Sequence, residues 1–262
     1  MAYVAGTNGS EALNGTYGAD YINALGGNDI IYGGYGSDNL DGGDGDDTFL
    51  VRGSEGPDFY TGGSGFDIIA VRNPDPAFSF IDLGISTLDS VEAIVNESSA
   101  TVNIKTDYIL DLSETTLVNI NSIQGSEGNN YLTGNVIYNN ALTEYRGIAI
   151  YGYGGNDEII GSVAGDRLDG GNGNDTLIGG EGDDTLIGGA GADYFRFDAN
   201  GGIDTVTDFV SGSDKIQLGP SITSVNLYNY NGNALLEFNG SSYAILSGVS
   251  PSAISSSDLV FA

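Results

Sequence analysis

The chain has 262 residues, enough for one or two domains, and its 36 acidic against 7 basic residues give a formal net charge of −29. It has no Cys, His or Trp, which excludes disulfides, zinc fingers, thiol catalysis and every His-dependent hydrolytic triad. A chain with this negative charge repels phosphate backbones and anionic membranes, and we therefore expect no nucleic-acid partner. No apolar run approaches the ~18 residues of a membrane span.

The N-terminal part of the chain is built from nine-residue units, which run from residue 6 to residue 70 with two extra residues, Val51 and Arg52, after the fifth unit. The fourth place of every unit is Gly, the sixth is acidic and the eighth is apolar or aromatic. Tandem self-similarity of this kind is the signature of a solenoid. The sixth places hold Glu11, Asp20, Asp29, Asp38, Asp47, Asp58 and Asp67.

Residues 71–124 break this period. Stretches such as FSFIDLGI, ATVNIKT and LVNINSI alternate between apolar and polar residues between short turns, which is typical of strands. We therefore expect wider β-helix coils that join two rolls. A polar cluster of Asp107, Tyr108, Asp111 and Glu114 suits a solvated edge better than a catalytic site.

A second block keeps the same frame from residue 125 to residue 196. Its first three units carry Asn130, Asn139 and Ile148 at the sixth place, where acids would be, and we expect the two Asn-bearing units to continue the core without full metal sites. The last five units carry Asp157, Asp166, Asp175, Asp184 and Asp193 at the sixth place.

The strand-like runs VNLYNY, ALLEFN and SYAILSGV follow the second block. They are expected to close the open end of the roll, because an uncovered coil exposes a strand edge.

The period itself predicts the geometry of the acids. Six Gly-rich residues make a turn and three residues make a short strand, so eighteen residues make one coil with eighth-place residues inside. Carboxylates of alternate units then stack ~4.8 Å apart, where like charges repel by roughly 3 kcal/mol at an effective dielectric of ~20. Calcium between turns would remove this cost, because it accepts six to eight oxygens in loose geometry, whereas magnesium demands a tight octahedron. The expected pairs are Asp20–Asp38, Asp29–Asp47, Asp157–Asp175, Asp166–Asp184 and Asp175–Asp193.

The units follow the pattern GGxGxDxUx, which resembles the RTX (repeats-in-toxin, haemolysin-type) calcium-binding family. The stretch FDANGGIDTVTDFVSGSDKIQL resembles the segment after the rolls in serralysin-type proteases and the R-modules of alginate epimerases. That resemblance implies that Asp198 and Asp204 complete the last calcium sites, while Asp208 and Asp214 also suit caps of the following turns. Acids at the third and fifth places are expected to be solvated, namely Asp44, Asp46, Glu181 and Asp183.

The predicted fold class is all-β, a parallel β-roll or β-helix solenoid with two RTX blocks, a β-helix-like connector and a β-rich C-terminal cap. The expected divisions are an N-terminal roll at 1–70, a connector at 71–124, a second roll at 125–196, and capping strands at 197–262. The last part includes a segment, 258–262, in which an acid precedes apolar residues, as in the uncleaved signals of type I secretion substrates. The N-terminal residues show no basic and apolar leader, and the repeats begin at residue 6, so we expect a stand-alone roll without a passenger.

The resulting hypothesis is a secreted, non-enzymatic protein that binds several Ca2+ ions and folds on binding them, because a ligand that binds only the folded state stabilises it. A structural, surface-associated or adhesive role fits this best. One alternative is a calcium-dependent module for extracellular polysaccharide, with tyrosines stacking on sugars. Another is a polysaccharide-active enzyme on the middle segment, with Lys105, Arg146 and Arg167 as the nearby basic groups. The tyrosines considered are Tyr138, Tyr145, Tyr151, Tyr153, Tyr228 and Tyr230.

Overall fold

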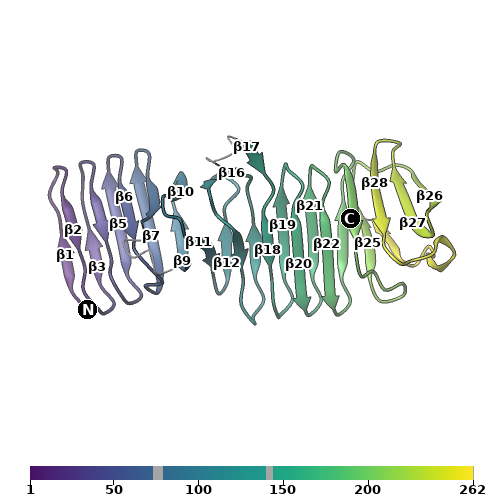
Figure 1. The fold of residues 1–262 in the computed structure, drawn as a ribbon, viewed down its shortest axis with the longest axis horizontal. Helices are drawn as coiled ribbons and strands as arrows, with labels where there is room; N and C mark the ends of the chain where they lie inside the picture. The colour runs from purple at the N-terminus through teal and green to yellow at the C-terminus, as the bar shows by residue number, and fades with distance from the viewer. Residues whose placement is uncertain (73–78, 140–143, 262) are drawn as a thin grey trace. The chain divides into compact units, whose positions relative to one another are not determined.

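A computed structural model describes residues 1–72, 79–139 and 144–261, almost all of them in short strands and turns. The chain forms two compact units, one of residues 1–122 with 137–144, the other of residues 123–136 with 145–262. Within each unit, two parallel sheets are built from alternate strands (Figure 1). The solenoid predicted from the repeat is therefore present. In the described ranges no helix is long and apolar enough to cross a membrane.

In the first unit the chain passes from one sheet to the other with every turn. One sheet contains β1 (Tyr3–Ala5), β3 (Tyr21–Asn23), β5 (Asn39–Asp44), β7 (Pro57–Ser64), β9 (Phe80–Asp89) and β11 (Thr101–Lys105). The other contains β2 (Ala12–Asn14), β4 (Ile30–Tyr32), β6 (Thr48–Val51), β8 (Ile68–Val71), β10 (Ala93–Asn96), β13 (Thr116–Val118) and β16 (Ile137–Asn139). A further short strand, β12 (Ile109–Asp111), follows β11.

The second unit repeats this arrangement. Its first sheet contains β18 (Ala149–Tyr151), β20 (Arg167–Asn172), β22 (Thr185–Ala190), β24 (Ile203–Val206), β28 (Ser242–Leu246), β27 (Asn233–Phe238) and β26 (Val225–Tyr230). Its other sheet contains β15 (Tyr131–Thr133), β19 (Glu158–Ser162), β21 (Thr176–Gly180), β23 (Tyr194–Phe197), β25 (Lys215–Leu218) and β29 (Leu259–Phe261). Strands β14 (Ser122–Gln124) and β17 (Glu144–Arg146) fall where the chain changes unit.

Strand register follows the eighteen-residue coil. Ile22 lies opposite Leu40, and Leu168 lies opposite Leu186. Across Val51 and Arg52 the separation grows by two, so that Phe49 lies opposite Ile69 and the register of the apolar residues is kept. These eighth-place side chains form the core: where the structure describes them, they are at most 2% exposed in both blocks, except Leu13 at 9%.

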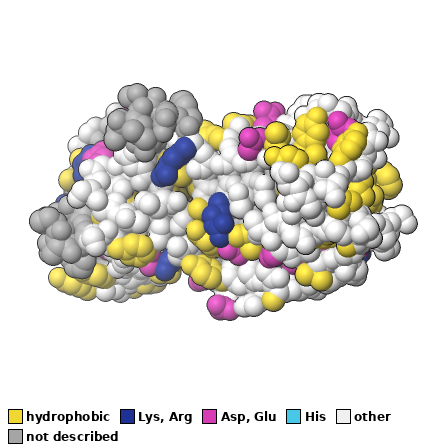
Figure 2. Space-filling view, turned by 45° about the vertical axis from the view of Figure 1, so that its right-hand side comes forward, with side chains coloured by type: hydrophobic (Ala, Val, Ile, Leu, Met, Phe, Trp, Pro, Cys, Tyr) yellow, Lys and Arg dark blue, Asp and Glu magenta, His cyan; other side chains and the backbone are white. Residues whose placement is uncertain are grey.

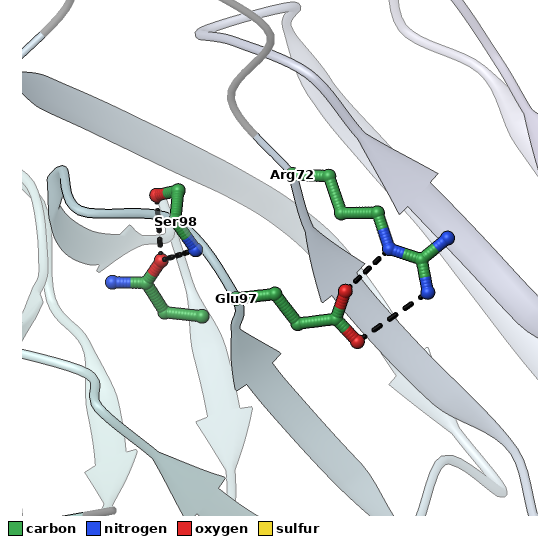
Figure 3. A network of polar contacts seen from close by, with 4 residues as sticks. Arg72, Glu97 and Ser98 are labelled. Atoms are coloured by element: carbon green, nitrogen blue, oxygen red, sulfur yellow. Dashed lines mark hydrogen bonds and ion pairs between the residues drawn. The ribbon is translucent and has the colours of Figure 1, made fainter. Parts of the chain in front are cut away.

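The connector strands continue the sheets of the first unit, as predicted for wider coils. β9 runs parallel to β7, and β10 runs parallel to β8. Polar contacts link the residues of a turn in this region: Nε and Nη2 of Arg72 donate to the two oxygens of the Glu97 carboxylate, and Asn96 accepts hydrogen bonds from Ser98 (Figure 3). The connector therefore belongs to the same solenoid, although it lacks the nonapeptide pattern.

The second unit ends in an antiparallel cap. β26, β27 and β28 are joined by tight hairpins, and β28 pairs in parallel with β24 of the roll. The three strands match the three runs expected to close the roll. In β27 buried and less buried residues alternate, so Ala234, Leu236 and Phe238 cover the end of the core.

Candidate metal centres

The sixth-place carboxylates stack in ladders that link one coil to the next. In each step the backbone N–H of one ladder residue donates to a carboxylate oxygen of the acid one coil further along, at 2.6–3.1 Å. All five pairs expected from the period are among these contacts. The pairing also continues across the Val51–Arg52 insertion, because Asp38 and Asp47 donate to Asp58 and Asp67.

Each unit carries two such ladders, which gives four in all among the described residues. The first ladder is Asp20, Asp38 and Asp58, and the second is Glu11, Asp29, Asp47, Asp67 and Glu92. The third ladder is Asn130, Asp157, Asp175, Asp193 and Asp214, and the fourth is Asp166, Asp184 and Asp204. Asn130 thus continues a ladder through its N–H, whereas the side chain of Asn139 lies outside the described residues.

Seven of these acids have a buried carboxylate oxygen with no hydrogen-bond partner among the described residues. In each case Oδ1 accepts the N–H of the preceding coil, and Oδ2 is the atom left over. We call the turns that carry them open turns. The acids are Asp29, Asp38, Asp47, Asp67, Asp157, Asp175 and Asp184.

The seven open turns share one backbone conformation. The residue four before each of the seven acids is in the left-handed region, for example Gly171 (φ 100°) before Asp175. Even where this residue is not Gly the conformation is kept, since Leu25 before Asp29 and Tyr153 before Asp157 both have φ 74°. A non-Gly residue pays of order 1–2 kcal/mol for that conformation, so the turn is held by its surroundings.

Other acids sit in capped turns, where a loop N–H covers the second oxygen. Thr16 donates from its N–H to Asp20 Oδ2 at 2.6 Å, and the N–H of Ser162 donates to Asp166 Oδ2. Val210 does the same for Asp214 at 2.7 Å. Such carboxylates are already satisfied by the protein, so they have less to gain from a cation than those of the open turns.

Main-chain oxygens stand beside the unpartnered carboxylate oxygens. A β-carbon on Gly170 would collide with Asp175 Oδ2 and would lie 2.8 Å from the carbonyl oxygen of Gly188, one coil further along. Gly at the first place therefore leaves room for both oxygens. No three acidic side chains converge on one point in the part of the chain that the structure describes, so a cation here would be held by carboxylates together with such carbonyls. This donor set suits calcium, a hard cation that takes many oxygen ligands.

The electrostatics of the open turns agree with this interpretation. Burial raises the pKa of Asp157 and Asp175 to about 6, and raises that of Asp184 to about 7. By contrast, hydrogen bonds from the Ala2 N–H and the Thr16 hydroxyl lower the pKa of Asp20. Burial also raises the pKa of the capped Asp166 to about 6, so buried acids of both kinds are costly to ionise in the metal-free fold.

The acids after the second block are placed differently from one another. Asp204 is 3% exposed and extends the fourth ladder, and burial raises its pKa to about 8. Asp198 joins no ladder; it is half-exposed, lies 3.5 Å from the Arg196 guanidinium and lines a hollow of about 410 Å³ with Asp204. Asp208 accepts N–H groups of Gly188 and Gly189. That these residues and the ladder acids bind calcium remains a prediction.

Sequence reasoning missed one ladder-end acid, one further buried acid and a second set of stacked side chains. Glu92 ends the second ladder, and Asp258, interpreted above as part of a secretion segment, is fully buried and accepts N–H groups of Gly212 and Ser255. At the fifth place, side-chain oxygens accept the N–H of the next coil, as Asn156 does from Asn174 at 2.8 Å. Two fifth-place acids expected to be solvated take part in the same way: Asp46 and Asp183 accept the N–H groups of Phe66 and Ile203.

The comparison with protein families decides the identity of the repeats. The family model for the RTX calcium-binding nonapeptide repeat matches residues 6–38, 14–49, 51–70, 119–136, 149–168, 160–195 and 169–206, just over half of the chain. The chain belongs to the RTX calcium-binding repeat family. No curated protein matches it.

Among solved structures, the chain is similar to the crystal structure of the extracellular lipase LipA from Serratia marcescens, with 22% identity and a TM-score of 0.31. The match covers 99% of this chain and 40% of the lipase chain. The RTX chain thus spans well under half the length of that protein. On the face shown in Figure 2 the few Lys and Arg side chains of the chain stand singly.

Proposed function

We propose that this RTX protein is an extracellular calcium-dependent structural protein, whose rolls fold when calcium binds between stacked turns. Bound calcium would supply the positive charge that the open turns lack. The chain's own groups then do the rest: the Asp N–H to Oδ1 bonds set the spacing of the coils, and the glycines admit the carbonyl oxygens. Extracellular modules bind calcium at about 10⁻⁴–10⁻³ M, so the chain would stay unfolded at cytosolic calcium and fold outside.

The observation that carries this proposal is the set of seven buried Oδ2 atoms without a donor. An unsatisfied buried acceptor costs about 1–3 kcal/mol, and more when it is charged. Seven such atoms at equivalent positions in successive turns are not a packing accident. A cation at each position would convert this cost into a gain in stability.

The first test is a calcium titration of the chelated full-length chain followed by far-UV circular dichroism, with magnesium as the control. We expect a cooperative gain of β signal in calcium alone, at sub-millimolar to millimolar concentrations. A chain that is already folded in chelator and unchanged by calcium would overturn the proposal. In that case the acids would be ordinary turn residues.

A matched pair of variants within one turn separates binding from charge. Asp184→Asn removes an unpartnered oxygen but keeps Oδ1, which accepts the Asp166 N–H at 2.7 Å. Glu181→Gln removes the same charge from an exposed third-place residue of that turn. We expect Asp184→Asn to bind fewer calcium ions and Glu181→Gln to bind as many as the parent chain, measured by equilibrium dialysis. Equal loss in both variants would contradict the site.

We further propose that the role is structural or adhesive, at the cell surface or in the surrounding matrix, with export by type I secretion. Support for a non-enzymatic role comes from the basic groups of the middle and second roll. Lys105 Nζ lies 2.6 Å from Asp82, and Arg167 lies 3.4 Å from Asp169, so both are paired with acids. Secretion can be tested by co-expressing the chain with a type I export system and deleting residues 258–262. Unchanged export would contradict a role for this segment.

Calcium-dependent carbohydrate binding is a second candidate, supported by two groups of exposed aromatic rings, of which the first was not considered from the sequence. Tyr17 and Tyr35 stack nearly parallel, 5.4 Å apart, and are 86% and 52% exposed. Tyr228 and Tyr230 are each 48% exposed on β26. Sugar rings stack on such platforms. A glycan array probed with the calcium-loaded chain tests this, and binding that survives Tyr17→Ala and Tyr35→Ala would argue against the first platform.

A further inference from the structure

The second ladder continues beyond the nonapeptide repeats, into the connector. Within the first block the N–H of each earlier acid donates to an Asp one coil further along, 18 or 20 residues away. Asp67 instead donates to Glu92 Oε2 at 2.6 Å, 25 residues away. The family match leaves out residues 71–118, so no matched nonapeptide repeat includes Glu92.

A hollow of about 300 Å³ lies over this end of the ladder. Its lining includes Asp89, Ser90, Glu92, Asp111 and Glu114. Acidic residues alone would not define a binding site, because they also suit a solvated edge. The deciding feature is therefore the set of oxygen atoms at the buried end of the ladder, next to this hollow.

Asp67 is fully buried, and its Oδ2 has no hydrogen-bond partner among the described residues. A β-carbon on Gly62 would collide both with this oxygen and with the carbonyl oxygen of Ser90, which lines the hollow. The two oxygens therefore converge beside Gly62. One coil earlier, a β-carbon on Gly42 would likewise meet Asp47 Oδ2 and lie 2.7 Å from the carbonyl of Gly62. Ser90 thus stands where the repeats place a first-place glycine.

The local backbone shows how a non-repeat turn reproduces this arrangement. Ser90 is in the left-handed region, with φ 52°, and only one residue separates it from Glu92. In a nonapeptide turn four residues separate the first-place glycine from the acid. The longer Glu side chain compensates for the shorter turn and reaches the Asp67 N–H.

We propose that Asp67, Glu92 and the Ser90 carbonyl form a further divalent-cation site outside the nonapeptide repeats. Two carboxylates balance the charge of one Ca2+ ion, and the carbonyl and water from the hollow complete an oxygen donor set of the kind calcium accepts. The inference rests on the proposed calcium-binding function. It adds that the connector is fastened to the first roll by calcium as well as by sheet pairing.

The test counts calcium ions bound per full-length chain by equilibrium dialysis, with folding followed by circular dichroism. We expect Glu92→Gln to bind one ion fewer than the parent chain. Asp67→Asn is expected to bind two ions fewer than the parent chain, because Asp67 faces both Asp47 and Glu92. The double variant Asp67→Asn with Glu92→Gln is expected to bind as many ions as Asp67→Asn alone. The control Glu158→Gln, an exposed acid on β19, is expected to bind as many as the parent.

An unchanged ion count in Glu92→Gln would overturn the site and show that Glu92 only accepts the Asp67 N–H. If Glu92→Gln fails to fold, the ion count of Asp67→Asn still decides. A loss of one ion instead of two would mean that the parent chain binds no ion between Asp67 and Glu92. A parent chain that binds no calcium would instead refute the proposed function itself. The two failures are therefore distinguishable.

Discussion

The substitution Asp175→Asn tests most directly whether the ladder acids are metal ligands or turn residues. Asp175 is fully buried in the middle of the third ladder. Its Oδ1 accepts the Asp157 N–H at 2.8 Å, its N–H donates to Asp193 at 2.9 Å, and its Oδ2 is unpartnered. Asn keeps the accepting oxygen and the N–H and replaces only the unpartnered oxygen by an amide. The substitution therefore changes charge and ligand capacity while the shape of the turn is kept.

The expected effect has opposite signs with and without calcium. In chelator at about pH 7.5, removing a carboxylate that stands about 4.8 Å from its ladder neighbours relieves up to about 3 kcal/mol of repulsion per neighbour, so the variant is more stable than the parent. In about 10 mM calcium, a site with a dissociation constant of 10⁻⁴–10⁻³ M contributes about 1.4–2.7 kcal/mol. Asp175 borders two inter-turn spaces, so the variant loses about 3–5 kcal/mol there.

Denaturant unfolding of parent and variant, in chelator and in calcium, measures both differences. A loss of stability of similar size in the two conditions would refute the reasoning. It would mean that the carboxylate acts through turn geometry alone. If residual structure in chelator is too low for an unfolding curve, the midpoint of the calcium-induced circular dichroism transition replaces it, and we expect that midpoint to move to higher calcium in the variant.

Three further outcomes follow from the turn geometry. Gly170→Ala is expected to displace Asp175 Oδ2 and reduce the number of calcium ions bound in dialysis, whereas Gly18→Ala, in open space, leaves the number unchanged. Leu25→Gly relieves a left-handed Leu and is expected to stabilise the calcium-loaded fold by about 1 kcal/mol in thermal melts, an effect that Leu25→Ala does not reproduce. Because burial raises the carboxyl pKa values, that of Asp184 to about 7, the folded state binds more protons than the unfolded chain, so in chelator the folded fraction measured by circular dichroism should fall as pH rises from about 4 to about 7. Calcium affinity should rise over the same range, and a parallel pH dependence of the two quantities would contradict this account.

The regular part of the fold was predictable because a single period fixes both burial and register. Once nine residues make half a coil, the eighth place faces inward and acids eighteen apart stack, as Leu168 and the Asp157–Asp175 pair show. The two-residue insertion did not disturb this, because Val51 extends β6 and pairs with Val71 while Phe49 stays opposite Ile69.

The differences between turns could not be predicted in the same way. Thr16 and Leu25 occupy the same place in their units, yet only Leu25 is left-handed, which leaves Asp29 Oδ2 without a donor while Asp20 is capped. Side-chain type alone does not specify this φ, since it depends on the neighbouring coil. Glu92 was missed for a related reason, because the 25-residue separation from Asp67 breaks the period that identifies the other ladder acids.

Every hydrogen bond in a ladder runs in the same direction, from the N–H of one coil to the carboxylate of the next, so each coil brings one donor and one acceptor to each ladder it joins. Excising eighteen residues, for example 170–187, would bring Asp157 to Asp193 and Asp166 to Asp204 and leave no donor or acceptor unmatched. Excising nine would keep the repeat pattern but exchange the two sheets for everything that follows, including the antiparallel cap on β24. The solenoid can thus lengthen or shorten in evolution only by whole coils of two units, because the terminal cap must stay on the same sheet.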